Sequence, residues 1–368
     1  MIALSLYFIN PLFYRILNYT LFMHSGVIAL YKLKLNRSVT LTLGILITYG
    51  LFQSIILDVS LSHIKNLFNL VGFVVILSFY SQIFSRFSND QLARYAYRCA
   101  LFWVLALLIF NFLFLNIEMA YNNLKWNNLN HFYLAINNAT GFQVTQKQTL
   151  AQLFTIGFFA SFQVKNPLLR YIILLSLFYI ISGSRSCTIG IIIALLAKKL
   201  SFSRNVNFVF IFYVTFIAAW LIIFNIIPES FREILNFDVR FAYFSAAYDM
   251  FLYSPFWGVG LFNVADFMTE RNDYFLAQYE NLNDFNGRFG NGLESGMLQF
   301  FISSGILGSF WIYLIGSKHT GYIRNNGWNW ISLSFVAIFV SSAFEDNLLF
   351  PIFYFMLTLI LKKQTNNA

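Results

Sequence analysis

Long apolar runs joined by shorter polar connections make up most of the chain. A membrane-spanning helix needs about 20 apolar residues, because every backbone group inside the lipid must be hydrogen-bonded within the segment. The stretch from Ile2 to Leu30 is interrupted by Pro11 and Arg15, so it fits one kinked span or two short ones. The pattern predicts an all-α fold, a polytopic transmembrane helix bundle of about 11–12 spans. Beyond the first stretch, the predicted spans are 39–57, 65–84, 98–116, 148–164, 168–184, 186–200, 206–227, 293–316, 328–344 and 347–361.

Basic residues are concentrated in alternate connections between these runs. Connections rich in Lys and Arg remain on the cytoplasmic side of a membrane. We therefore expect the intervening connections, including 116–147 and 228–292, to face the periplasm. The basic clusters are Lys32, Lys34 and Arg37; Arg86, Arg94 and Arg98; Lys165 and Arg170; Lys198, Lys199 and Arg204; Lys318 and Arg324; and Lys362 and Lys363.

The outward connection 228–292 is too long to be only a connector. Connections longer than about 15 residues are usually functional or disordered. This one is rich in Phe, Tyr and Trp, a composition that disordered segments lack. We therefore expect residues 1–368 to form a single integral membrane domain that contains one large, ordered periplasmic loop at 228–292.

Part of this loop has the pattern of a helix. Over residues 239–253, polar side chains are interspersed with aromatic ones, which predicts an amphipathic helix lying at the membrane interface. Ser254-Pro255 is expected to end the helix, because proline cannot continue it. Gly258 and Gly260 are expected to allow a tight turn directly afterwards.

The composition agrees with lipid as the main solvent of the chain. Hydrophobic residues make up 58% and charged residues 11% of the 368 residues, and the mean hydropathy is +0.65. A soluble domain has roughly 25% charged residues, so this chain has too few charges to cover a water-facing surface. The first apolar run has neither a basic segment before it nor an A-x-A-like site, so we expect it to remain in the protein.

The net charge of +9 does not indicate a nucleic-acid partner, because the basic residues come in twos and threes between apolar runs. Cys99 and Cys187 are the only cysteines, and both lie in or beside apolar segments. They provide neither a disulfide framework nor a metal-ligand spacing. We expect no cofactor, no metal and no nucleic acid.

Three arginines are candidates for binding an anion at the outer side. Arg185 lies between two apolar spans, where an arginine at membrane depth costs roughly 2.5–3.5 kcal/mol on insertion scales and tends to be kept for a reason. Arg240 begins the predicted loop helix, and Arg288 lies near the end of the same loop. Arginine donates paired hydrogen bonds to phosphate, so two or three of them at one outer mouth would hold a diphosphate. The alternatives are a snorkelling Arg185 and solvated loop arginines.

Carboxylates and one histidine are candidates for the chemical step. Glu294 follows a glycine-rich turn where the run 293–316 begins, so it is either a helix cap or an acid, base or sugar-hydroxyl acceptor. Asp249, on the predicted loop helix, is a second candidate for the same role. His131, in the outward connection 116–147, is a third candidate, whose alternative is an ordinary surface residue.

Several of these pieces occur in an order that resembles the O-antigen polymerase and O-antigen ligase superfamily. The resemblance covers about residues 180 to 310, and elsewhere it extends only to the presence of transmembrane segments. Its most specific element is Ser-Pro-x-x-Gly-x-Gly. The pieces are Ser182-Gly183-Ser184-Arg185; Val239-Arg240; Ser254-Pro255-Phe256-Trp257-Gly258-Val259-Gly260-Leu261-Phe262; Glu294 with Leu298-Gln299-Phe300; and Ser304-Gly305-Ile306-Leu307-Gly308.

The resemblance implies a metal-independent glycosyltransferase of the bacterial inner membrane. Such enzymes act at the periplasmic face on undecaprenyl-diphosphate-linked oligosaccharides in lipopolysaccharide biosynthesis. Arg185 and Arg240 match the diphosphate-binding arginine positions of the family. Besides the lipid-linked substrates and the bilayer, the resemblance allows a chain-length regulator protein as a partner. Many ligases carry a His-Asn pair where this chain has Glu294-Ser295, which favours a polymerase over a ligase.

Three other functions remain open at this stage. A ligase would transfer finished polymer to lipid A core. A flippase or transporter of lipid-linked sugars is expected to have charged or Gly/Pro-broken spans at mid-membrane, whereas the ionisable residues of this chain gather at one outer face. A purely structural membrane subunit would not need the large aromatic loop. The preferred hypothesis is an O-antigen polymerase.

Overall fold

The protein is described here from a computed structural model, in which all regular structure of the described residues is helical. The described residues are 37–57, 63–64, 67–68, 70–71, 77, 81, 83–114, 147–164, 167–181, 185–200, 206–228, 239–270, 293, 295–344 and 351–361. The helices are α3 (Arg37–Ile56), α5 (Asn89–Phe114), α8 (Lys147–Val164), α9 (Pro167–Ile181), α10 (Arg185–Lys199), α11 (Phe208–Ile226), α13 (Val239–Tyr253), α14 (Val264–Glu270), α16 (Gly296–Asn326), α17 (Trp330–Ser341) and α18 (Pro351–Leu361).

The helical membrane bundle predicted from the apolar runs is confirmed. Helices α3, α11 and α16 are long and apolar enough to cross a membrane, and α17 and part of α8 are shorter apolar helices. The predicted spans at 2–30 and 65–84 lie wholly or largely outside the described residues, so the total number of spans stays a prediction.

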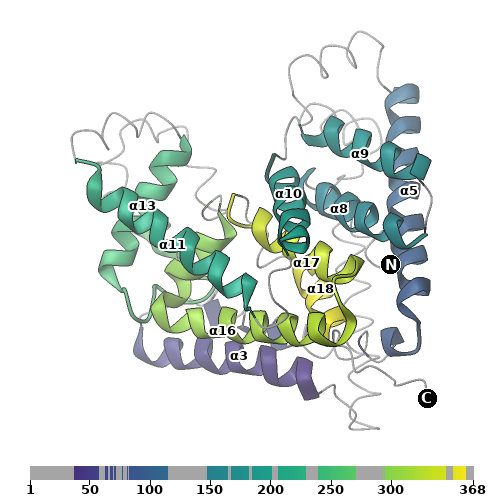
Figure 1. Cartoon of the computed structure of the whole chain (residues 1–368). Coiled ribbons are helices and arrows are strands. Elements are labelled where there is room, and N and C mark those ends of the chain that lie inside the picture. The colour runs from purple at the N-terminus through teal and green to yellow at the C-terminus, as the bar shows by residue number, and fades with distance from the viewer. Residues whose placement is uncertain are drawn as a thin grey trace.

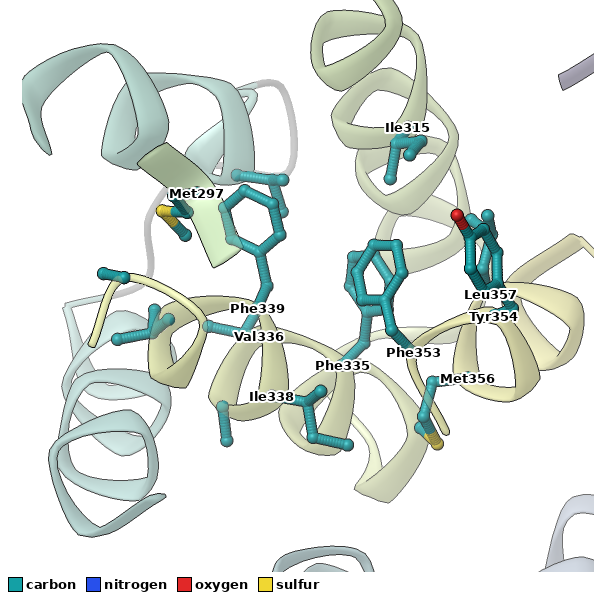
Figure 2. Close-up of a cluster of buried hydrophobic side chains, with 14 of the residues drawn as sticks. Met297, Ile315, Phe335, Val336, Ile338, Phe339, Phe353, Tyr354, Met356 and Leu357 are labelled. Atoms are coloured by element: carbon teal, nitrogen blue, oxygen red, sulfur yellow. The ribbon is translucent and has the colours of Figure 1, made fainter. Parts of the chain in front are cut away.

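Helix α17 is buried along its whole length and forms the centre of the bundle. It packs against α10, α8 and α18, while α16 packs against α3, α11 and α13. Figure 1 shows α3 and α16 running side by side, with α17 and α18 drawn above the right-hand part of α16. In Figure 2, Phe335 and Phe339 of α17 meet Phe353 of α18, with ring centroids 5.4 and 6.4 Å apart. These aromatic contacts join α17 to α18, the last of the described helices.

Two helices extend beyond the predicted spans because polar residues continue them. Helix α5 begins at Asn89, where Ser88 and Gln91 form a reciprocal capping box. Helix α16 continues to Asn326, past the predicted end at 316, and is closed by Gly327 with φ 67°. Hydropathy marks where a span meets water, whereas backbone hydrogen bonds decide where its helix ends.

Contacts between helix ends agree with the predicted alternation of sides. Three hydrogen bonds join ends that carry the basic clusters: Gln163 Nε2 to Asp90 Oδ1 at 2.5 Å, Trp330 Nε1 to the Asn89 carbonyl at 3.3 Å, and Thr320 Oγ1 to the Val206 carbonyl at 3.3 Å. At the opposite ends of their helices, the Met297 amide donates to the Ser342 carbonyl at 3.0 Å. The packing therefore brings together ends expected on one side, and which side faces the periplasm stays a prediction.

Candidate functional site

Arg185 is the first residue of α10, and its side chain is exposed. The predicted span began one residue later, so the arginine belongs to the helix rather than to the turn before it. The first backbone amides of a helix have no partner inside the helix, and together with the helix dipole they attract anions. A guanidinium at this position adds a full charge to the same end. The geometry suits a phosphate approaching the N-terminus of α10.

The start of α10 is held against α17 by close backbone contact. Ser186 and Cys187 are buried directly after Arg185. One turn further, a side chain on Gly190 would collide with the backbone of Ala337. Small residues at a helix contact in a membrane protein allow this approach of two backbones. Arg185 therefore stands on a helix end whose position is fixed by the core of the bundle.

Helix α13 has the predicted bounds, Val239–Tyr253, and ends directly before Ser254-Pro255 as expected. The predicted water-facing polar side is wrong for side chains 243–251, which are buried or partly buried, including Ser245 at 5% exposure. The helix packs against α11 and α16. Apolar residues occur on all faces of the α13 sequence, a pattern typical of a buried helix, whereas Leu252 and Tyr253 at its C-terminal end are exposed.

The side of α13 near its C-terminus is fixed by aromatic and polar contacts. The Tyr248 hydroxyl donates to Asn225 Oδ1 of α11 at 2.8 Å. Trp220 of α11 meets the rings of Tyr248 and Phe251 at centroid distances of 6.0 and 6.4 Å. Asp249 is half-buried on this helix. The backbone of Arg240 lies in the first turn of α13, but its side chain is outside the described part of the structure. Binding of one diphosphate by Arg240 and Arg185 together therefore stays a prediction.

Helix α16 is broken at Gly305, where φ is 63° and ψ is −168°. A helix break leaves carbonyls before it and amides after it without their usual partners. Broken helices inside a membrane persist only where protein supplies those partners. Gly-broken spans are typical of transporters, where the free backbone groups coordinate substrate or ions, so the partners of the backbone groups at this break distinguish the two functions.

The segment that follows α13 supplies the missing partners. The amides of Val259 and Gly260 donate to the carbonyls of Ile302 and Ser303, both at 3.0 Å. After the break, the amides of Ile306 and Leu307 donate to the carbonyls of Pro255 and Phe256, at 3.0 and 3.3 Å. We call this arrangement of 255–260 against 302–307 the junction. Its four hydrogen bonds fill the break with protein backbone, which differs from an ion-coordinating transporter helix.

Two glycines make the junction possible. Gly258 has φ 72°, in agreement with the tight turn expected at this glycine. A side chain at Gly258 would meet the Gly305 amide nitrogen at 2.6 Å. A side chain on Gly305 would in turn meet the Gly258 amide nitrogen at 2.6 Å. Positive φ and close backbone approach both require glycine. Two of the sequence pieces that carry the family resemblance therefore form one backbone contact.

The residues after Gly260 return the chain to helix. Phe262 has φ 64°, a left-handed conformation that costs a non-glycine residue roughly 1–2 kcal/mol. Asn263 follows, and its side chain donates to the Val259 carbonyl at 2.9 Å. The Asn263 carbonyl accepts the Phe267 amide at 2.8 Å, the first hydrogen bond of α14. The strained Phe262 persists because bonded residues on both sides define its backbone.

The N-cap of α16 is Ser295, whose hydroxyl accepts the Leu298 amide at 3.3 Å. Glu294 was expected to be either a helix cap or a chemical group, and the capping hydrogen bond is made by its neighbour Ser295. Glu294, Arg288 and His131 lie outside the described residues. Among the described residues, His, Cys, Asp and Glu form no group of three or more that could hold a metal ion.

A comparison with protein families agrees with the sequence pieces noted above. Residues 171–313 match the family model described as O-antigen ligase. The match runs from α9 to the first residues after the break in α16, and it includes Arg185, α13 and the whole junction. It confirms the resemblance to the O-antigen polymerase and ligase superfamily. No curated protein and no solved structure matches the chain.

Proposed function

We propose that this membrane protein is an O-antigen polymerase, a glycosyltransferase that joins undecaprenyl-diphosphate-linked oligosaccharide repeat units at the periplasmic face of the inner membrane. The observation that carries the proposal is the position of Arg185. This residue lies within the family match, at an exposed helix N-terminus, and α10 is fixed against the buried α17. The site therefore offers a rigid, positively charged receptor for a lipid-anchored diphosphate.

The reaction transfers the growing glycan to the next lipid-linked repeat unit. A hydroxyl oxygen of the acceptor sugar forms a bond with the anomeric carbon of the donor. The bond from that carbon to the diphosphate oxygen breaks, and its electron pair leaves with undecaprenyl diphosphate. Positive charge develops on the sugar ring and negative charge on the leaving group. Arg185 and the first amides of α10 stabilise the leaving diphosphate, and Arg240 is proposed as the second contact.

Glu294 is proposed to accept the proton of the acceptor hydroxyl, with Asp249 as the other candidate for acceptor contact. Support for Glu294 comes from its neighbour, because Ser295 already makes the capping hydrogen bond of α16. Arg288 and His131 are proposed to bind sugar or phosphate oxygens from the outward connections. A base on the acceptor hydroxyl raises its nucleophilicity as the leaving group departs.

The family description favours a second candidate, an O-antigen ligase that transfers finished polymer to lipid A core. The two functions share the donor and the leaving group and differ in the acceptor. A gel of lipopolysaccharide from a strain lacking the protein separates them. Loss of a polymerase leaves core carrying a single repeat unit, whereas loss of a ligase leaves bare core. Bare core would therefore replace the polymerase with the ligase.

The direct test is polymerisation by purified protein supplied with lipid-linked repeat units. Arg185→Ala and Arg240→Ala are each expected to lower polymer formation at least about 100-fold, since removing one oxyanion-stabilising donor commonly costs 10²–10³ in rate. Arg185→Lys is expected to rescue poorly, because an ammonium is a point charge where a two-pronged donor is needed. Arg324→Ala is a matched control, an exposed arginine in the last turn of α16. Full activity of both alanine variants would show that the diphosphate is bound elsewhere.

A further inference from the structure

The junction is bound by a side chain from outside the family match. Gln53 of α3 is completely buried, and its amide nitrogen donates to the Trp257 carbonyl at 2.5 Å and to the Ser303 carbonyl at 2.9 Å. Its amide oxygen accepts the Leu261 amide at 3.0 Å. A glutamine side chain has two N–H donors, and both are used here. One residue therefore bonds both halves of the junction.

Neighbouring groups on the same side of the molecule reinforce this contact. Tyr49, one turn before Gln53 on α3, places its hydroxyl 3.1 Å from the Trp257 carbonyl and 2.5 Å from the Ser304 carbonyl. The buried His63 has Nδ1 against the Leu261 carbonyl and Nε2 3.2 Å from the Gly50 carbonyl. Tyr49 and Gln53 of α3, together with His63, thus form a polar cluster against the backbone contact that the family-matching segments create.

We propose that Gln53 is a positioning residue for glycosyl transfer, and this inference rests on the proposed function. Helix α13 begins with Val239-Arg240 and ends at the junction, and the first turns of α16 begin directly after Glu294-Ser295. Gln53 joins Trp257, four residues after the end of α13, to Ser303, in the part of α16 before its break. It sets the relative placement of the segment carrying Arg240 and the segment carrying Glu294, without touching substrate.

The three hydrogen bonds of Gln53 can be removed without removing the junction. The four backbone hydrogen bonds between 255–260 and 302–307 do not involve Gln53, nor does the contact of Gly258 with Gly305. A variant lacking the amide is therefore expected to fold but to hold the two segments less precisely. Catalysis is sensitive to such changes, because a misplacement of about 1 Å can cost 10²-fold in rate.

The test combines kinetics with a distance measurement on the purified full chain. Gln53→Leu removes all three hydrogen bonds, and Gln53→Glu keeps an oxygen for the Leu261 amide while replacing the donor nitrogen. Both are expected to lower kcat for polymerisation about 10- to 100-fold, with KM changed less than about threefold. The matched control is Ser54→Ala on the same helix, since the Ser54 hydroxyl donates to the Leu51 carbonyl of its own helix, at 2.7 Å.

The distance between two spin labels measures the relative position of α13 and α16 independently of enzyme activity. Labels on Leu252→Cys of α13 and Phe310→Cys of α16, two exposed positions, report the separation of these helices in protein with Cys99 and Cys187 replaced by alanine. In the Gln53→Leu protein the distance distribution is expected to broaden or shift, and in Ser54→Ala it is expected to match wild type.

The outcomes separate this inference from the proposed function. Wild-type kcat with an unchanged distance distribution in both Gln53 variants would overturn the positioning role. Failure of both variants to fold would also overturn it, because Gln53 would then be a structural residue only. If the wild-type protein forms no polymer, the proposed function fails, and the spin-label distances alone decide whether Gln53 positions α13 against α16.

Discussion

Two glycine contacts in this molecule hold the two helices that carry the candidate arginines. The first joins α10, which begins with Arg185, to α17 through Gly190 and Ala337. Gly190 has an ordinary helical backbone, and its only requirement is space for the facing backbone. A contact of this kind can yield gradually, since one helix is able to shift by a fraction of an ångström against the other.

The second contact is the junction, which follows α13 and contains Gly258 and Gly305. Both glycines have positive φ, and each occupies the space where the other would carry a side chain. Each side also supplies backbone hydrogen bonds to the other. A small shift here breaks bonds and exposes unpaired backbone groups, so the contact is formed completely or not at all. Glycine is therefore required at the α10–α17 contact because it leaves space for a facing backbone, and at the junction also because it adopts a positive φ.

Gly305→Ala should have the largest effect. The new side chain meets the Gly258 amide nitrogen at 2.6 Å, and the positive φ adds a cost of roughly 1–2 kcal/mol. We expect little or no monodisperse protein, measured by size-exclusion chromatography of the detergent extract. Gly44→Ala is the matched control, because a side chain at Gly44 meets nothing within 4 Å. A stable Gly305→Ala protein would mean that the break is not held by this contact.

Gly190→Ala should be milder but clear. Its side chain would overlap the Ala337 carbonyl oxygen and lie 3.0 Å from the carbonyl carbon, so α10 must move away from α17. Overpacking of this kind costs typically 1–3 kcal/mol. The expected result is folded protein with a lower unfolding temperature in detergent, measured by light scattering or tryptophan fluorescence. The control is Gly321→Ala, another glycine with open space around it. A loss as complete as that of Gly305→Ala would remove the distinction between the two contacts.

Tyr49→Phe should have the smallest effect of the three. The variant loses the hydroxyl that contacts the Ser304 and Trp257 carbonyls, and the Trp257 carbonyl keeps its hydrogen bond from Gln53. A net loss of roughly 0.5–1.5 kcal/mol is typical for one hydrogen bond. The same thermal measurement should place this variant between wild type and Gly190→Ala. A drop larger than that of Gly190→Ala would show that Tyr49, not the backbone pairing, holds the junction.

Much of the fold was predictable because its signals are local. The end of α13 at Tyr253 follows from Ser254-Pro255, and the turn at Gly258 follows from its glycine. The start of α5 had a local signal too, the Ser88 and Gln91 capping box, which hydropathy alone does not detect. Apolar runs defined most of the other described helices within a few residues.

The junction was not predictable by the same reasoning because its partners are distant in the chain. Gly305 lies in an apolar run where glycine is common, and Gln53 is a single polar residue in another run. That Gln53 and Gly305 contribute to the same contact becomes visible only in the folded structure, where residues near 53, 258 and 303 lie together. The burial of α13 was missed for a related reason, since Ser245 and Asp249 suggested a water-facing side that α11 and α16 instead cover.

The break in α16 also has a consequence for how the protein is assembled. A ribosome delivers α3 first, the segment after α13 later, and α16 later still. Until Ile302 and Ser303 enter the membrane, the amides of Val259 and Gly260 lack their carbonyl partners, and the Gln53 amide nitrogen lacks one of its two acceptors. Unpaired polar groups are costly in an apolar surrounding. Insertion of the first turns of α16 therefore completes the junction before α17 and α18 are added, and it joins regions that were synthesised some 250 residues apart.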